Sequence, residues 1–158
     1  MTERVDSDVS TYPVLTITRI FDAPRALVFK AWTDPNMLAR WWGPHHFTNP
    51  VCDVDVRPGG GIRIDMRGPE GNVYPMTGVF HEVVEPERLI FSTTPLDDDG
   101  KPMFEVLNTV AFEDHDGRTK FTLQARVVKT TAVAAQYLDG MEAGWTQSLE
   151  RLEEILKS

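Results

Sequence analysis

Apolar and polar residues alternate along most of the chain, and this pattern predicts a domain rich in β-strands. The first alternating stretch is 14–21, which ends shortly before Pro24. Further alternating stretches follow, and each break between them carries the Gly, Pro, Asp or Asn residues that are typical of tight turns. The strands predicted there are 51–55, 61–67, 73–84, 89–94, 104–112 and 119–128. Because the links between these strands are short, we expect one antiparallel meander.

The spacing of apolar residues changes to that of an α-helix on both sides of this region. Two short helices are expected between the first two strands, with Asp22 as the cap of the first. The second begins at Asp34 and Pro35 and ends before Gly43. One long helix is expected over about 131–157. Its apolar stripe consists of Ala134, Leu138, Met141, Trp145, Leu149, Leu152 and Leu156.

Tryptophan residues lie on both helical regions that flank the predicted sheet. A curled antiparallel sheet that wraps around one helix encloses more space than that helix can fill. The pattern therefore predicts an α+β fold with an apolar cavity between the sheet and the C-terminal helix. The residues expected to bind a small hydrophobic or aromatic ligand there are Trp41, Trp42, Tyr74, Met76, Phe80, Phe91, Asn108, Met141 and Trp145.

Few polar side chains fall on the inward-facing side of the predicted strands. They are Tyr74, Glu82, Thr93 and Asn108. His45 and His46 follow the second short helix and could overhang the mouth of the cavity. A cavity with a few polar groups is typical of small-molecule binding, and Tyr74 and Asn108 would orient the ligand. The same groups leave open an enzyme of the cyclase, dehydratase or isomerase type that uses a histidine, Tyr74 or Glu82.

Charge and composition exclude several other classes of function. The net charge of the 158-residue chain is −8 and no run of Lys and Arg occurs, so we expect neither nucleic acid nor an anionic membrane as a partner. Cys52 is the single cysteine, which fits a reducing compartment. No apolar run approaches the roughly 18 residues that span a bilayer. We expect one cytoplasmic domain over residues 13–158, preceded by a flexible polar lead-in over 1–12.

No metal, cofactor or catalytic residue is predicted. The His and Cys residues of segment 45–53 lack the spacing of zinc ligands. The acidic run at 97–100 lacks the alternating ligands of a calcium loop, so it is read as a turn. The glycines at 59–61 precede a strand and not a helix, which disfavours a phosphate-binding loop.

Several motifs in order along the chain carry a family resemblance. They are Phe21-Asp22-Ala23-Pro24, the segment 28–35, Trp41-Trp42-Gly43-Pro44, Arg57-Pro58-Gly59-Gly60, Gly78-Val79-Phe80, Pro86-Glu87-Arg88-Leu89 and Gly144-Trp145. Over residues 14–156 the chain resembles the START-like SRPBCC superfamily. Within it, the chain is similar to bacterial proteins named after the C-terminal domain of the Hsp-90 ATPase activator. The resemblance implies a helix-grip fold: a seven-stranded antiparallel curved sheet around a long C-terminal helix, with two short helices between the first two strands.

The resemblance also implies an internal cavity, which in relatives holds lipids, polyketides, aromatic metabolites or hormones. It transfers no single activity, because the superfamily includes binding proteins, aromatase/cyclases, resistance proteins that sequester a toxic product and co-chaperone domains. Three hypotheses therefore stand beside one another: a ligand-binding protein, an enzyme that uses the same cavity, and a chaperone-linked interaction module associated with stress. An exposed strand edge leaves a homodimer open.

Overall fold

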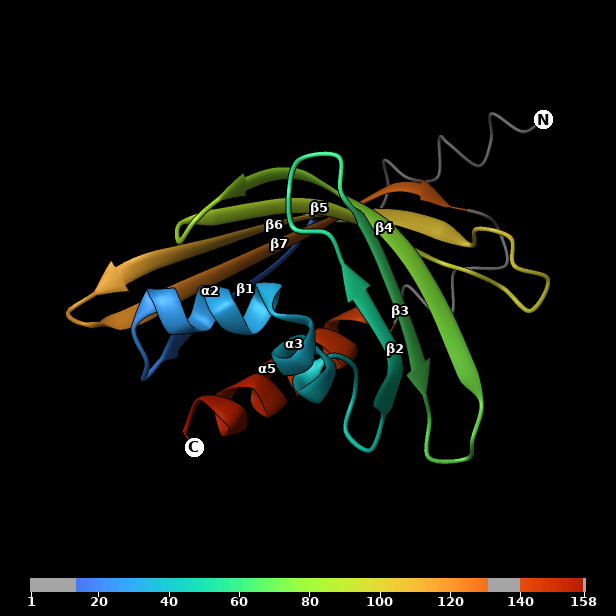
Figure 1. The fold of residues 1–158 in the computed structure, drawn as a ribbon, viewed down its shortest axis with the longest axis horizontal. Coiled ribbons are helices and arrows are strands. Elements are labelled where there is room, and N and C mark those ends of the chain that lie inside the picture. Colours follow the sequence, from blue (N-terminus) through green and yellow to red (C-terminus); the bar gives the residue numbers. More distant parts are fainter. Residues whose placement is uncertain (1–13, 131–139, 158) are drawn as a thin grey trace.

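The computed structural model describes residues 14–130 and 140–157, which form one curved sheet that grips a helix (Figure 1). In chain order the elements are β1 (Leu15–Phe21), α2 (Arg25–Thr33), α3 (Pro35–Trp41), β2 (Thr48–Val54), β3 (Gly61–Arg67), β4 (Val73–Val84), β5 (Arg88–Pro95), β6 (Phe104–His115), β7 (Arg118–Thr130) and α5 (Met141–Leu156). The seven strands are ordered β1-β7-β6-β5-β4-β3-β2, and all neighbours are antiparallel. The predicted helix-grip fold is confirmed.

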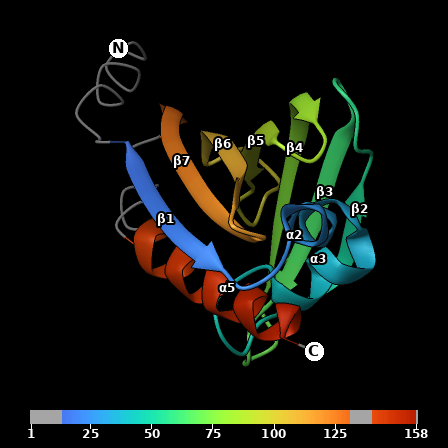
Figure 2. The same ribbon diagram turned by 90° about the vertical axis from the view of Figure 1, so that its left-hand side faces the viewer.

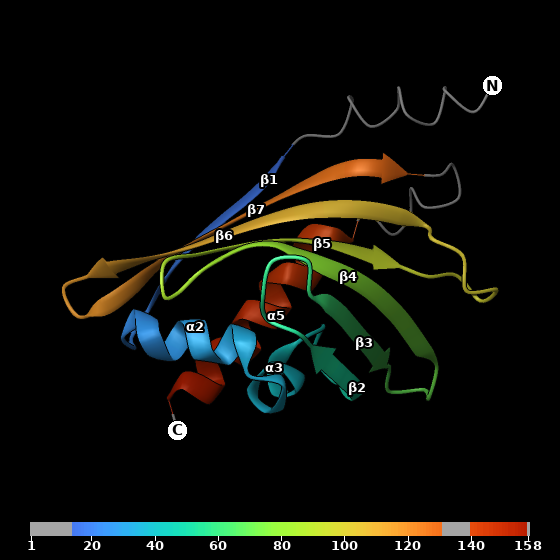
Figure 3. The same cartoon turned by 45° about the horizontal axis from the view of Figure 1, so that its top comes forward.

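All three described helices lie on the concave face of the sheet (Figures 2 and 3). Helix α2 contacts β6, β7 and α5, whereas α3 contacts β2 and α5. The two short helices therefore approach different strands of one sheet. None of the described helices is long and apolar enough to cross a membrane.

The helix starts show which local signals decide the boundaries. Asp34 accepts a hydrogen bond from the backbone N–H of Asn36 at 2.9 Å, and Pro35 occupies the first turn of α3, as predicted. The expectation that Asp22 caps α2 is wrong, because Pro24 is the capping residue and no side chain within residues 14–130 and 140–157 caps this helix. The Pro24 carbonyl oxygen accepts from the backbone N–H groups of the first turn, so Asp22 lies too early in the chain to reach them.

Strand β4 contains a bulge that the alternating pattern does not reveal. The pairing of β4 with β5 shifts register between Phe80 and Glu82. One extra residue at this point reverses which side chains face inward. Glu82, predicted to face the interior, is therefore 41% exposed at its side chain and forms an ion pair with Arg88. This correction removes Glu82 from the interior.

Tight packing fills the space between α2, α5 and strands β6 and β7. We call this region the packed half; its buried side chains include Val28, Phe29, Trp32, Phe112, Phe121, Leu149 and Leu152. The Trp32 ring stacks on Phe121 with ring centroids 5.6 Å apart, and on Trp145 at 5.9 Å. Leu149 and Leu152 carry the predicted apolar stripe of α5 into this core. The earlier stripe positions Ala134 and Leu138, and the expected lead-in over 1–12, lie outside the described residues.

Candidate ligand cavity

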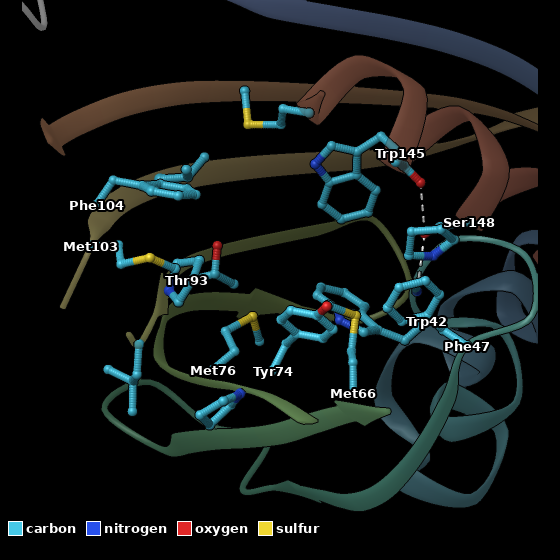
Figure 4. Close-up of a pocket in the computed structure, with 18 of the residues that line it drawn as sticks. Trp42, Phe47, Met66, Tyr74, Met76, Thr93, Met103, Phe104, Trp145 and Ser148 are labelled. Carbon is cyan, nitrogen blue, oxygen red and sulfur yellow. Dashed lines mark hydrogen bonds between the residues drawn. The ribbon is translucent and has the colours of Figure 1, made fainter. Parts of the chain in front are cut away.

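A cavity of about 430 Å³ lies beside the packed half, between the first turns of α5 and strands β3, β4, β5 and β6 (Figure 4). We call this region the cavity half. Its aromatic wall consists of Trp42, Phe47, Tyr74, Phe104 and Trp145. Four methionines complete most of the apolar surface: Met66, Met76, Met103 and Met141. The polar side chains on its wall are Thr93, Asn108 and Ser148. The cavity is therefore a mainly apolar space with few hydrogen-bonding groups.

The loop after α3 forms one wall, and its glycine is required by geometry. Gly43 has a φ of +97°, which L-residues with a side chain rarely adopt. A Cβ atom there would also lie 2.9 Å from the sulfur of Met66. Glycine thus lets the chain turn sharply between Trp42 and Pro44, and both of these neighbours line the cavity.

Helix α5 holds this loop in place through polar side chains. The Nη1 atom of Arg151 donates to the carbonyl oxygens of Trp42, Gly43 and Pro44 at 3.1, 3.0 and 3.0 Å. Ser148 Oγ accepts from the Gly43 N–H at 3.0 Å and donates to the carbonyl of its own helix one turn earlier. Burial lowers the pKa of Arg151. The loop and the helix are therefore joined as one wall of the cavity.

A buried asparagine lies at the inner end of the cavity. Asn108 is fully buried, and its Nδ2 donates to the carbonyl oxygens of Phe91 at 3.3 Å and Val106 at 3.4 Å and to Thr93 Oγ1 at 3.1 Å. Carbonyl oxygens only accept, so these contacts fix the orientation of the amide. Asn108 Oδ1 has no partner among the described residues.

The structure divides the predicted ligand-binding residues into two groups. Those that line the cavity are Trp42, Tyr74, Met76, Asn108, Met141 and Trp145. Trp41, Phe80 and Phe91 lie elsewhere. Trp41 is fully buried and donates its indole N–H to the Ala31 carbonyl at 2.9 Å. Phe80 and Phe91 are cross-strand partners that line a separate space of only about 10 Å³ next to Trp32. Ligand binding by the residues of either group stays a prediction.

Sequence reasoning missed several wall residues for identifiable reasons. Met66 and Phe104 lie on the inward-facing side of their strands, so their positions were visible in the pattern. Phe47 and Met103 lie in connections outside the strands, where no periodicity marks them. Ser148 is a polar residue whose partner is 105 positions away, and no local signal identifies it.

The groups considered for acid–base chemistry do not meet inside the cavity. His45 Nε2 lies 2.9 Å from an oxygen of Glu150, and both side chains are exposed. His46 is exposed on the same loop, and Glu82 is turned outward by the bulge. Among the described residues, Tyr74 is the one ionisable side chain that lines the cavity.

Cys52 lies on β2, outside the residues that line the cavity. Burial raises the pKa of its thiol to about 11, and the neighbouring Asp53 carboxylate adds to this shift. The thiolate, which is the nucleophile and metal ligand, is therefore scarce at neutral pH. Within residues 14–130 and 140–157, no three His, Cys, Asp or Glu side chains are grouped so as to hold a metal ion.

Comparison with known proteins gives both a family and a set of similar structures. The family model of Activator of Hsp90 ATPase homolog 1-like protein matches residues 22–157. A solved protein structure from Arthrobacter aurescens is 28% identical, with a TM-score of 0.82, and the match covers 97% of this chain and 90% of that chain. A protein from Mycobacterium smegmatis is 32% identical over 90% of both chains, with a TM-score of 0.77. The AHSA1 protein from Silicibacter pomeroyi is 26% identical over 92% of this chain and 98% of that chain, with a TM-score of 0.79. No curated protein matches the sequence with significance.

Proposed function

Because the chain belongs to the family of Activator of Hsp90 ATPase homolog 1-like proteins, we propose that it binds a small, uncharged hydrophobic or aromatic molecule inside its cavity. The family and the fold support a ligand-binding or Hsp90-associated domain in general terms. The observation that carries the finer proposal is the cavity of about 430 Å³ and the chemistry of its wall. Ligand pockets typically measure about 300–1,000 Å³ and are lined mainly by apolar side chains.

The aromatic wall offers surfaces on which a flat ligand can stack. The rings of Trp42 and Trp145 meet edge to face with centroids 5.3 Å apart, and Phe47 lies 5.9 Å from Tyr74. Aromatic pairs of this kind favour offset or edge-to-face contact with another ring. The methionine side chains between them are flexible and adapt to irregular shapes. Together these features favour aromatic ligands without requiring one particular outline.

The charge of the wall argues for a neutral ligand. Among the described residues, none that lines the cavity carries a carboxylate, ammonium, guanidinium or imidazole group. A charged ligand would lose its hydration there without gaining an ion-pair partner, which costs several kcal/mol or more. The net charge of −8 on the whole chain adds repulsion for anions.

The two other hypotheses gain less support from the geometry. An acid–base enzyme needs titratable groups that converge on the ligand, and only Tyr74 of the candidates lies on the wall.

An interaction module needs an exposed apolar patch. The large exposed apolar residues of the described chain are Val14, Ile20, Val73 and Tyr74. The first two lie at β1 and the last two on β4, with three strands between them, so they do not form one patch.

Blocking the cavity from the helix side tests the proposal. A Cβ atom built on Gly144 meets no atom within 4 Å, and Gly144 lines the cavity. The substitution Gly144→Leu therefore fills part of the space. The substitution Ala143→Leu is the matched control, because it adds a larger side chain at the neighbouring, exposed position of the same helix. The neutral fluorescent probe N-phenyl-1-naphthylamine reports binding through its emission in an apolar environment.

We expect saturable binding of the probe to the unaltered protein and to Ala143→Leu, and an affinity at least about tenfold weaker for Gly144→Leu. Circular dichroism shows whether each variant is folded. Equal affinity in all three folded proteins would place the probe outside the cavity and contradict the proposal.

A further inference from the structure

The free polar groups on the cavity wall are mainly hydrogen-bond donors. Trp42 and Trp145 each carry an indole N–H, and neither makes a hydrogen bond to the described part of the chain. Neither indole nitrogen is among the fully buried atoms that lack a partner, so each keeps accessible surface, and both residues line the cavity. Figure 4 shows the indole nitrogen of Trp145 on the edge of the ring that faces the open space. Indole offers a donor and no acceptor.

The hydroxyl groups on the wall add further donors. Thr93 Oγ1 already accepts from Asn108, so its own proton remains available to a ligand. The Tyr74 hydroxyl makes no hydrogen bond within the described residues and belongs to a side chain that is 40% exposed. Ser148 adds nothing, since its hydroxyl both accepts from Gly43 and donates to Gly144.

The acceptors of the wall are largely engaged by the protein itself. Arg151 donates hydrogen bonds to the carbonyl oxygens of Trp42, Gly43 and Pro44. The carbonyls of Pro75 and Pro95, farther along the same wall, accept from the backbone N–H groups of Leu96 and Met103. Among the described residues, the other side-chain acceptors on the wall without a hydrogen-bond partner are the weakly accepting sulfurs of Met66, Met76 and Met141 and the Tyr74 oxygen.

Asn108 Oδ1 is the exception, because it is an acceptor without a partner in the described part of the chain. This atom is fully buried, however, so a ligand in the cavity does not reach it without a shift of the wall. A donor on the ligand would therefore meet the Tyr74 oxygen and weak sulfur acceptors, and a donor buried away from these groups would stay unpaired at a cost.

We propose that the cavity selects uncharged aromatic ligands that carry a hydrogen-bond acceptor, such as a ring ketone oxygen, with the indole N–H groups of Trp42 and Trp145 as the selecting donors. This inference rests on the proposed function and narrows its ligand class. A ketone oxygen has two lone pairs and no proton, which matches a wall of donors. The same ring system without the oxygen would leave the indole N–H groups unpaired.

Three compounds with one ring skeleton test this selectivity: 9-fluorenone, fluorene and 9-hydroxyfluorene. Equilibrium dialysis gives the Kd of each compound for the unaltered protein and for Trp145→Phe and Trp42→Phe, which keep an aromatic ring and remove the N–H. The readout is the ratio of the fluorene Kd to the fluorenone Kd. Differences in water solubility between the two compounds cancel when this ratio is compared between proteins.

We expect the ratio to fall by about three- to tenfold in at least one of the two variants, because one hydrogen bond to the ketone is lost. The fluorene Kd itself should change much less. Trp41→Phe is the matched control, since Trp41 is buried outside the cavity with its N–H bound to Ala31, and its ratio should equal that of the unaltered protein. The alcohol should bind more weakly than the ketone.

The outcomes separate the two proposals. If none of the three compounds binds the unaltered protein, cavity binding of aromatic ligands itself fails. If fluorene and fluorenone bind and their ratio is the same in Trp42→Phe, Trp145→Phe and the control, acceptor selection fails while ligand binding stands. Tighter binding of the alcohol than of the ketone also overturns the inference, since it would show that an acceptor on the wall binds a donor on the ligand.

Discussion

The packed half and the cavity half lie under one sheet and along one helix, yet only one of them is filled. Leu149 and Leu152 of α5 are almost completely buried, whereas Met141 and Trp145, earlier on the same helix, border open space. The difference comes from the second helical layer. Helix α2 brings bulky side chains such as Trp32 against β6, β7 and α5. Among the described residues, the loop after α3 is what meets the cavity half from the helical side, and space is left beside it.

This contrast teaches that the amphipathic pattern of α5 does not by itself determine where a cavity forms. The apolar stripe is continuous from Met141 to Leu156. The sequence alone therefore predicts the same kind of apolar contact at both ends of the helix. What differs is the number of layers that meet the stripe. Leu149 and Leu152 meet further packed side chains and become core, whereas Met141 and Trp145 border open space and form part of a wall.

The largest expected effect compares truncations in the two halves. Leu152→Ala removes a fully buried side chain from the packed half and should lower the free energy of unfolding by about 2–5 kcal/mol. Met141→Ala removes a partly exposed side chain from the cavity wall and should cost less than about 1 kcal/mol. Urea denaturation followed by circular dichroism measures both. Equal losses would mean that Met141 is packed as tightly as Leu152 and that the cavity half is filled.

Two glycines give a second comparison with opposite signs. A Cβ atom on Gly78 would lie 2.2 Å from the Ser92 carbonyl oxygen, so Gly78→Ala should destabilise the protein by about 1–3 kcal/mol. Gly144 lies inside α5 with open space around its Cβ position, so Gly144→Ala should stabilise it by about 0.5–1 kcal/mol. Thermal unfolding of the two variants measures the signs. A destabilised Gly144→Ala would show that the helix meets another element there.

Much of the fold follows from the sequence, because strands and helices differ in period. The strands Gly61–Arg67 and Val73–Val84 were predicted to the residue by alternation and by the turn residues that bound them. The sequence did not predict which inward-facing residues belong to the core and which line the cavity. Phe80 and Phe91 alternate inward as Met76 does, but they face the region that Trp32 covers. Which inward residues meet a ligand depends on the helix opposite them, and periodicity carries no information about that helix.

The hydrogen bonds that build the cavity wall were also outside the reach of local patterns. Arg151 lies off the apolar stripe of α5 and looks like any exposed basic residue. Its carbonyl partners lie more than 100 positions earlier in the chain. Only the fold brings the loop after α3 against this helix.

The smallest expected effect concerns Glu82, where the sign of a pH dependence distinguishes the two possible orientations of the side chain. The hydrogen bond from Arg88 lowers the pKa of Glu82 below its usual value, and partial burial opposes this shift. A carboxyl whose pKa is lowered in the folded state adds stability above its unfolded pKa and loses it as the pH falls through the folded pKa. Glu82→Gln removes this contribution.

The urea midpoints of Glu82→Gln and the unaltered protein should therefore differ slightly at neutral pH and converge as the pH falls through the folded-state pKa of Glu82. The difference stays small because the pair is exposed to solvent. An inward Glu82, as strict alternation along β4 predicts, would behave in the opposite way. Burial would raise its pKa, and the unaltered protein would gain on the variant as the pH falls. A gain at acidic pH would thus contradict the bulge and return a carboxyl group to the interior, next to the cavity that we propose to be neutral.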